Sequence, residues 1–201
     1  MPSWSAASRR HGRIVTVSPS FPRVKRTAPG YAVAAVDAFL EQARTAYDST
    51  YAQATVMTST EIRTASFPQE RGGYSSRHVD AALERLETAF AARERAIAIA
   101  AQGEALWLEK ASHESAVLTA RFARKDKHRF ARVGAFVQGY AVVDVDVFAE
   151  RVSNFLEYGG ELTLADVRSV TFRARRGGYD EVQVDAALDA VVALLLALGQ
   201  S

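Results

Sequence analysis

The sequence has no cysteine, five prolines and no long hydrophobic run among its 201 residues. The absence of cysteine excludes a disulfide framework and thiolate metal sites, and it is typical of proteins of the reducing cytoplasm. Scarce proline, together with abundant alanine, arginine and leucine, favours helices. The longest apolar stretch, 190–198, is about half of the ~20 residues that span a bilayer. Residues 1–13 lack the apolar segment of a secretory signal, so we expect a cytoplasmic protein whose contact with a membrane is peripheral.

Basic residues are concentrated in two stretches, although the net charge is only +2. No acidic residue precedes Asp37, and residues 1–20 have few periodic apolar positions, so we predict a disordered basic tail there. The second stretch runs from Arg121 to Arg132 and is interpreted as the joint between two halves. Such stretches are solvated arms, or they attract anionic lipid with about 1 kcal/mol per basic residue, or they contact nucleic-acid phosphates.

One short motif occurs four times along the chain. In each copy a Gly-Tyr pair is followed by a valine five residues after the tyrosine and an aspartate six residues after it. The copies are Gly30, Tyr31, Val36 and Asp37; Gly73, Tyr74, Val79 and Asp80; Gly139, Tyr140, Val145 and Asp146; and Gly178, Tyr179, Val184 and Asp185. Repetition with such constant spacing indicates a structural unit used four times.

The motif predicts that a helix begins at each copy. In the last copy Asp180 is the expected N-cap, and Gln183 has the spacing of a capping box. Tyr179 and Val184 have the spacing of a hydrophobic staple, and the glycines 177–178 can supply a positive φ. The repeated aspartates lie near the positive ends of the helix dipoles, where negative charge is favoured. The repeated Phe, Tyr and Val side chains are expected in the core.

The four copies form two module types in the order A-B-A-B. A phenylalanine precedes each tyrosine by a long, short, long and short gap, and these residues are Phe21, Phe67, Phe130 and Phe172. The B modules share a lead-in in which Thr58 or Thr60, and later Thr163, are expected to cap a short helix. We therefore predict a first A–B pair over 21–122 and a second over 123–201.

The spacing of apolar residues predicts the long helices. The expected ranges are about 33–54, 142–157 and 181–198, with a longer element from Ser75 onward. From Val79 to Leu118 apolar residues follow an imperfect heptad pattern, which indicates coiled-coil packing against another chain or the second half. Gly103 is the expected place for a bend or break. The last helix is apolar on every side near its end, which predicts burial in a core or a seam between chains.

These residues resemble a known family. The pattern T-x-x-[DE]-[IV] followed by Phe and then R-G-G-Y-x-x-x-x-V-D-x-x-L resembles the N-terminal domain of DivIVA-type bacterial proteins in their actinobacterial short-repeat form. The resemblance covers 21–40, 58–90 and 130–198. It implies a coiled-coil scaffold without enzymatic activity that gathers at curved membrane, at cell poles and septa.

The chain departs from the family at the turn that contacts the bilayer. Family members commonly carry an exposed Phe and then Arg before the Gly-Tyr pair, whereas both B modules here read R-G-G-Y. Arg71 and Arg176 occupy the position of that Phe. Phe136 in the second A module is a candidate substitute, and arginines near the last turn can bind lipid phosphates without insertion. The candidate membrane or anion contacts are Arg71, Phe136, Arg173, Arg175 and Arg176.

No catalytic or metal-binding pattern is evident. The four histidines are scattered, and we see no nucleophile–base pair and no phosphate-binding glycine loop. We expect neither enzymatic activity nor a cofactor, a metal or a small-molecule substrate. The predicted fold is all-α, with tandem short-turn and long-helix modules and coiled-coil-like packing, and the two halves pack on each other as an intramolecular pseudo-dimer or on another chain.

Two functional hypotheses follow from the resemblance. The first is a scaffold or adaptor for cell division or polar growth at the inner face of the membrane, at pole or septum, whose partners are itself, a DivIVA-type protein and the anionic membrane surface. The second is a soluble helical interaction module that binds a full-length DivIVA-type partner without touching membrane; the missing Phe of the B modules favours it. A third hypothesis, which does not follow from the resemblance, is nucleic-acid binding through the basic tail.

Overall fold

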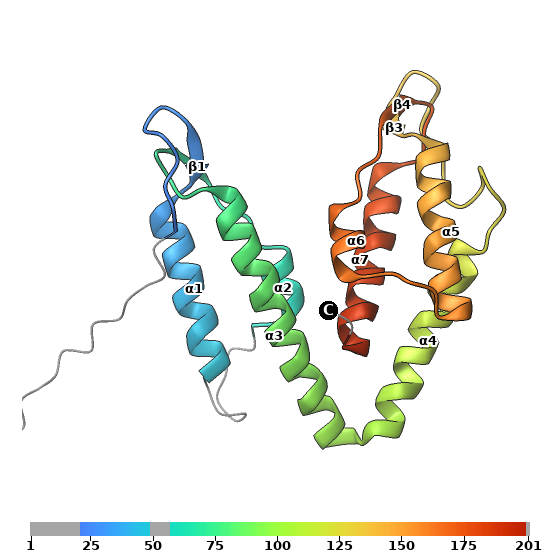
Figure 1. The fold of residues 1–201 in the computed structure, drawn as a ribbon, viewed down its shortest axis with the longest axis horizontal. Helices are drawn as coiled ribbons and strands as arrows, with labels where there is room; N and C mark the ends of the chain where they lie inside the picture. The colour runs from blue at the N-terminus through green and yellow to red at the C-terminus, as the bar shows by residue number, and fades with distance from the viewer. Residues whose placement is uncertain (1–20, 49–56, 200–201) are drawn as a thin grey trace, which may run out of the picture. The chain divides into compact units, whose positions relative to one another are not determined.

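A computed structural model describes residues 21–48 and 57–199, and in that part the chain is mostly helical (Figure 1). In chain order the elements are β1 (Pro29–Tyr31), α1 (Val33–Asp48), α2 (Ser59–Arg63), β2 (Gln69–Arg71), α3 (Ser76–Gln102), α4 (Glu104–Phe122), β3 (Gln138–Tyr140), α5 (Val142–Tyr158), α6 (Leu164–Ser169), β4 (Ala174–Arg176) and α7 (Glu181–Leu198). The predicted tail 1–20 and the predicted end of the first long helix, 49–54, lie outside the described residues.

Contacts along the chain divide it into two compact units. Of the described residues, unit 1 takes 21–48 and 65–82, and unit 2 takes 57–64 and 83–199. Helix α3 belongs to unit 1 up to Ala82 and to unit 2 from Leu83 onward. The units therefore do not follow the ends of the two predicted A–B pairs, because the helix that starts in the first pair continues into the second unit.

Each unit contains a short antiparallel ribbon that the sequence did not predict. In unit 1 β1 pairs with β2, with Gly30 opposite Glu70, and in unit 2 β3 pairs with β4, with Gly139 opposite Arg175. The ribbons join the turn of an A module to the turn of a B module. The expectation of an all-α fold holds for the long elements, and the three-residue strands are an addition to it.

All four long helices that follow the repeated motif begin close to the predicted positions, at Val33, Ser76, Val142 and Glu181. The four motif valines are buried, with exposed fractions of 0–2%. The Asp180 side chain accepts a hydrogen bond from the Gln183 amide at 3.1 Å, as an N-cap does. The predicted capping box is nevertheless wrong here, because the Gln183 side chain accepts from the Ala131 amide instead. The staple contact between tyrosine and valine stays a prediction.

The two short helices α2 and α6 carry complete capping boxes. The hydroxyl of Thr58 accepts from the Glu61 amide, and the Glu61 carboxylate accepts from the Thr58 amide at 2.7 Å. Thr163 and Asp166 repeat the arrangement at the start of α6. The predicted caps are confirmed at Thr58 and Thr163.

The long element predicted from residue 75 onward is broken at Gly103. Helix α3 ends at Gln102 and α4 begins at Glu104, so the break is a single residue. Gly103 has a φ of 88°, which favours glycine strongly over residues with a Cβ. No side chain caps the start of α4. The continuous heptad seam across this point stays a prediction.

Helix α7 lies in the core of unit 2, as its apolar composition predicted. Its buried residues are Val184, Ala187, Val191, Val192, Leu194, Leu195 and Leu196. They join one cluster with side chains from α4, α5 and α6 and with Ala91 of α3. Of the two options for this helix, burial inside the unit is the one observed.

Candidate functional site

The repeated tyrosines join the two modules of each unit through their backbones. In unit 2 the Tyr140 amide donates to the Tyr179 carbonyl at 3.0 Å, and the Tyr179 amide donates back at 2.8 Å. Tyr31 and Tyr74 form the same reciprocal pair in unit 1, at 2.9 and 2.8 Å. We call each such arrangement a clasp, meaning the paired Tyr residues of one A and one B module with their neighbouring glycines.

The glycines of the clasp let two backbones approach closely. A Cβ on Gly178 would lie 2.3 Å from the Tyr140 carbonyl oxygen, and one on Gly139 would lie 2.2 Å from that of Tyr179. Gly177 has a φ of 63°, as the sequence predicted for this glycine pair, whereas Gly178 is needed for the close approach. The same two roles fall to Gly72 and Gly73 in unit 1.

The motif aspartates bind the tyrosine of the opposite module. The Tyr74 hydroxyl donates to Asp37 at 3.2 Å, the Tyr179 hydroxyl to Asp146 at 3.0 Å and the Tyr140 hydroxyl to Asp185 at 3.5 Å. The sequence explained these carboxylates only by the helix dipole. Their second role was not found because each partner lies in another module, although the constant spacing of Tyr and Asp was a usable signal.

Burial raises the pKa of the clasp tyrosines. The effect is largest for Tyr179, whose pKa rises to about 12 through burial and then through its hydrogen bond to Asp146. Burial followed by the partner aspartate also raises the pKa of Tyr31, Tyr74 and Tyr140. For Tyr31 that aspartate is Asp80, and each unit therefore holds a reciprocal pair of Tyr–Asp contacts.

The motif phenylalanines also cross between modules. Phe21 packs edge-on against Tyr74, and Phe67 packs against Tyr31, each with ring centroids 5.4 Å apart. In unit 2 Phe130 meets Tyr179 and Phe172 meets Tyr140 in the same way. The repeated aromatic residues are thus part of the packing, as expected, but each phenylalanine serves the tyrosine of the other module.

Unit 2 adds a buried ion pair to its clasp. Arg129, 5% exposed, places Nη1 3.2 Å from Oδ1 of Asp146, which is itself 7% exposed. The same guanidinium donates to the carbonyls of Phe122 and Asp146, and the Lys127 amide donates to Asp146 at 2.9 Å. Arg129 belongs to the basic stretch 121–132. At least this charge of the stretch therefore has a structural role inside unit 2 and is not presented to another molecule.

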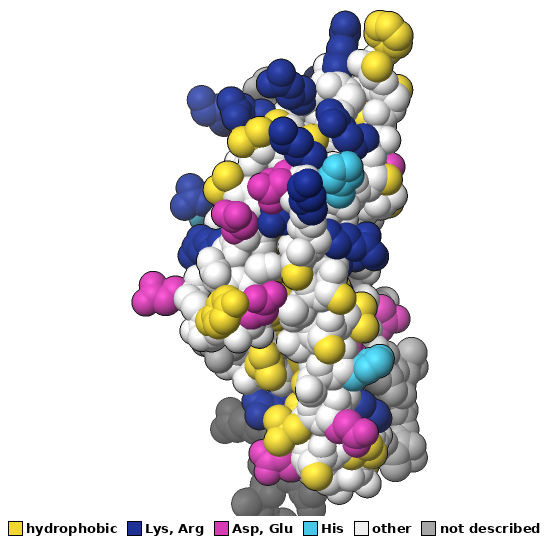
Figure 2. Space-filling model, turned by 90° about the vertical axis from the view of Figure 1, so that its right-hand side faces the viewer, with side chains coloured by type: hydrophobic (Ala, Val, Ile, Leu, Met, Phe, Trp, Pro, Cys, Tyr) yellow, Lys and Arg dark blue, Asp and Glu magenta, His cyan; other side chains and the backbone are white. Residues whose placement is uncertain are grey.

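The candidate contact residues gather at the ribbon end of unit 2. Phe136 is 89% exposed and Val137 is 56% exposed, just before β3. Arg176 lies opposite Gln138 in the ribbon, and Arg175 lies opposite Gly139; both arginines are exposed. Figure 2 shows Lys and Arg side chains gathered around this end of the face that it displays, with hydrophobic side chains at the edge. We call Phe136, Val137, Arg175 and Arg176 the unit 2 tip.

Arg173 is held by an internal partner. Its Nε and Nη2 donate to the two carboxylate oxygens of Asp144 at 2.8 and 2.6 Å, and its amide donates to the same carboxylate at 3.2 Å. Hydrogen bonds from Arg173 lower the pKa of Asp144 to about 2. Arg132 similarly donates to the carbonyl of Gly177. Both arginines stabilise the ribbon. Asp144 offsets the charge of Arg173, whereas the carbonyl that Arg132 binds is neutral and leaves the charge of Arg132 in place.

The equivalent end of unit 1 has a different chemistry. Arg71, the remaining candidate, is exposed opposite Pro29 at the end of its ribbon. Thr27 stands at the repeat position of Phe136, and exposed Lys25 and Arg26 precede it. Unit 1 therefore presents a basic end without a large apolar side chain, and unit 2 presents an apolar side chain beside its arginines.

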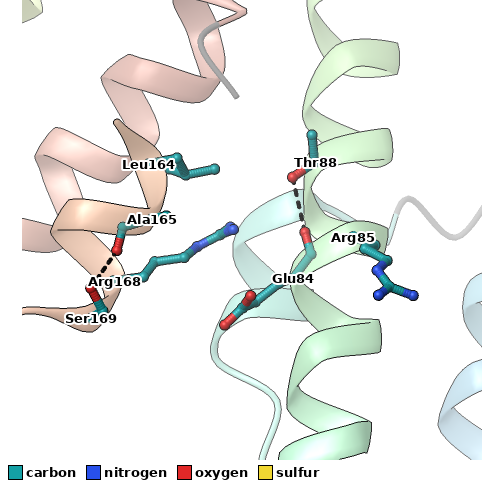
Figure 3. Close-up of a pocket in the computed structure, with 7 residues that line it drawn as sticks. All are labelled: Glu84, Arg85, Thr88, Leu164, Ala165, Arg168 and Ser169. Carbon is teal, nitrogen blue, oxygen red and sulfur yellow. Dashed lines mark hydrogen bonds between the residues drawn. The ribbon is translucent and has the colours of Figure 1, made fainter. Parts of the chain in front are cut away.

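A groove in unit 2 lies between α3 and α6 and has a volume of about 370 Å³ (Figure 3). Arg168 reaches across it toward α3, where it pairs with the buried Glu87. The hydroxyls of Thr88 and Ser169 in its wall donate to carbonyls of their own helices. Burial raises the pKa of Glu87, against the effect of Arg168 and Arg63. The groove is thus a seam between helices whose charged groups face one another.

The described residues contain no group of three or more His, Asp or Glu side chains that could hold a metal ion. Within the same residues, no helix has the length and apolarity required to cross a bilayer. Comparison with family models, with curated proteins and with solved structures finds no match for the chain.

Proposed function

We propose that the chain is a non-catalytic helical scaffold or adaptor of the DivIVA type, which acts in cell division or polar growth at the cytoplasmic face of the membrane, at pole or septum. The observation that carries the proposal is the unit 2 tip. There Phe136, which is 89% exposed, lies beside exposed arginines on the hydrogen-bonded ribbon of β3 and β4. An exposed aromatic side chain flanked by cations suits the interface of an anionic bilayer, because the ring enters the apolar region and the cations meet phosphates.

Co-sedimentation with vesicles tests the membrane part of this proposal. The intact chain is expected to bind vesicles that contain an anionic phospholipid, with an affinity that falls as salt is added. Phe136→Thr copies the residue of the matching position in unit 1 and should weaken binding about tenfold or more, because burying a Phe side chain contributes about 1.5–3 kcal/mol.

The chain offers a matched control for that experiment. Thr27→Phe places the same ring at the end of unit 1 and should strengthen binding if the ring inserts there as well. Equal affinities for the wild type and Phe136→Thr would contradict insertion at the unit 2 tip. A fluorescent fusion with no enrichment at pole or septum would contradict the cellular role.

The second candidate is an interaction module that binds a DivIVA-type protein without membrane contact. It is favoured by the ion pair of Arg173 with Asp144, which offsets one of the cations at the ribbon end. Absence of binding to anionic vesicles at low salt, together with co-purification with such a partner, would support this candidate against the first.

A further inference from the structure

We propose that two copies of this chain exchange halves about Gly103, so that α3 and α4 join into one helix and the contacts between α3 and the α6–α7 pair form between copies. The exchange adds to the proposed scaffold function a way in which the chain self-associates. The argument for the exchange depends on the hinge at Gly103 and on the contacts around it. Vesicle binding tests the scaffold separately, so the two can fail independently.

The exchanged contact is an ion cluster formed by Arg63, Glu87, Arg168 and Asp189. Glu87 of α3 is 3% exposed and pairs with Arg168 of α6. Arg63 of α2 lies 3.7 Å from Glu87 and also donates to the carbonyl of Asp189 in α7 at 3.3 Å. Arg63 and Arg168 stand at the same position of the two B modules. The contact is therefore made by repeated parts, which is the kind of surface that self-associates by two-fold symmetry.

The segments on the two sides of Gly103 each have contacts of their own. On the first side α2 is tied to α3, because the Ser59 amide and hydroxyl both donate to Glu94 at 2.7 Å. On the second side α4 packs against α5 and α7. The ion cluster and the packing of Ala91 into the core cross between the two sides. Opening at Gly103 thus keeps the contacts within each side and offers the ion cluster to a second copy.

The hinge itself is short and exposed. A single residue with a φ of 88° reverses the chain between two helices, and a Cβ added there would meet nothing within 4 Å. The break is therefore not imposed by packing around the residue. Short hinges of this kind favour domain swapping, because the open form removes the sharp turn between the helices. The contacts made within one chain in the closed form are made between two copies in the open form.

The open form also covers an apolar side chain that the closed form leaves exposed. Leu106 is 40% exposed and Leu108 is 51% exposed, both in the first turns of α4 next to the hinge. In a symmetric swapped dimer the two continuous helices cross near their hinges, and the crossing covers one of these leucines, because residues two apart in a helix point to opposite sides. Helices on both sides of Gly103 are long enough to continue each other in register with the predicted heptads.

Two hinge variants test the exchange by opposite effects on mass in solution. Gly103→Ala disfavours the positive φ and favours a continuous helix, so it should tighten dimerisation at least about tenfold, as seen by light scattering over a dilution series. Insertion of three glycines after Gly103 relaxes the turn and should leave a monomer. Equal masses for the two variants at every concentration would overturn the proposal.

A charge-exchange pair distinguishes swapping from side-by-side pairing. Glu87→Arg alone and Arg168→Glu alone each bring like charges together in the cluster. Mixed in equal amounts after unfolding and refolding, they should give a heterodimer, because each swapped contact then holds one charge of each sign. Circular dichroism of the refolded mixture reports whether both variants have regained their helices. With the helices regained, recovery of the separate species and no heterodimer by native mass spectrometry would overturn the proposal.

Discussion

At the scale of single residues, the hydroxyl of a buried tyrosine needs a partner, and a carboxylate from the opposite module supplies it. This requirement explains why the motif pairs Tyr and Asp at constant spacing. The two residues of one motif do not bind each other, but each reaches the other module of its unit. Asp146 differs from Asp37, its equivalent in unit 1, because it also meets the buried guanidinium of Arg129.

The first prediction concerns this buried pair. Asp146→Asn should lower the free energy of unfolding by about 3 kcal/mol, because it removes the buried partner of Arg129 and leaves only the exposed Asp126 to offset that buried charge. Asp37→Asn, at the matching position without such an arginine, should cost about 1 kcal/mol through a weaker hydrogen bond. Urea unfolding followed by circular dichroism measures both. Equal losses for the two variants would show that the ion pair has no special importance.

The second prediction concerns pH. The pKa of Tyr179 is about 12 in the folded protein, against about 10 in an unfolded chain. Its contribution to stability is complete below pH ~10 and falls by about 1.4 kcal/mol per pH unit up to ~12, because the unfolded state loses its proton first. Tyrosinate absorbance in the folded protein should show this late titration, which Tyr179→Phe removes. The chain has seven tyrosines, so the difference between the wild-type and Tyr179→Phe curves isolates this residue, and a difference centred near pH ~10 would contradict the prediction.

At the scale of elements, the short helices α2 and α6 depend on their capping boxes. An isolated helix of five or six residues is unstable, so its ends must be satisfied and its apolar face buried. Thr163 caps the first turn of α6, and Leu164 and Val167 form its buried apolar face. The position of Arg168, and hence its pairing with Glu87, depends on this small helix.

The third prediction tests the cap of α6. Thr163→Ala should lower the free energy of unfolding by about 1 kcal/mol, because the amide of Asp166 loses its acceptor. Thr163→Ser keeps a hydroxyl at the same place and should change little. Thermal or urea unfolding of both variants gives the comparison, and an unchanged Thr163→Ala protein would mean that the cap is dispensable.

The fourth prediction tests the ribbon. Gly178→Ala should destabilise the protein by about 1–3 kcal/mol, because the new methyl group would lie 2.3 Å from the Tyr140 carbonyl and must push the strands apart. Gly134→Ala is the control in the same unit, since the nearest atom there is a side-chain carbon at 3.7 Å. If the control loses as much stability as Gly178→Ala, close approach is not the reason for the glycine.

At the scale of the whole molecule, the two units differ in how much apolar surface they bury. Helix α1 of unit 1 buries Val36 and Ala43, whereas α7 of unit 2 is buried along most of its length. The large apolar cluster around α7 includes side chains from every helix of unit 2 between α3 and α7. Local opening should therefore require less free energy in unit 1.

The fifth prediction follows from that difference. Backbone amides of α1 should exchange with solvent deuterium at least about tenfold faster than those in the middle of α7, because fewer buried contacts must be broken. Hydrogen exchange monitored by mass spectrometry resolves the two helices. Equal protection would indicate that the units open together as one cooperative structure.

Much of the element level was predictable from the sequence. The starts of the four long helices, the caps at Thr58 and Thr163, and the burial of α7 all follow from patterns within one or two helical turns. The predicted capping box at Asp180 failed because a backbone amide far along the chain, that of Ala131, competes for the Gln183 side chain. The strands were missed because three residues are too few to show an alternating pattern.

Caps and periodic positions act over a few neighbouring residues, so the starts of the helices and their apolar faces follow from the amino-acid order alone. The pairing of each tyrosine with its aspartate, and of Arg63 and Arg168 with Glu87, depends instead on how distant segments pack in three dimensions. Tyr179 and Asp146 are 33 positions apart and Arg168 and Glu87 are 81 positions apart, and the identical motifs make several pairings chemically equivalent. The choice among equivalent partners depends on the ribbons and the packed helices, whose energies arise from many residues together.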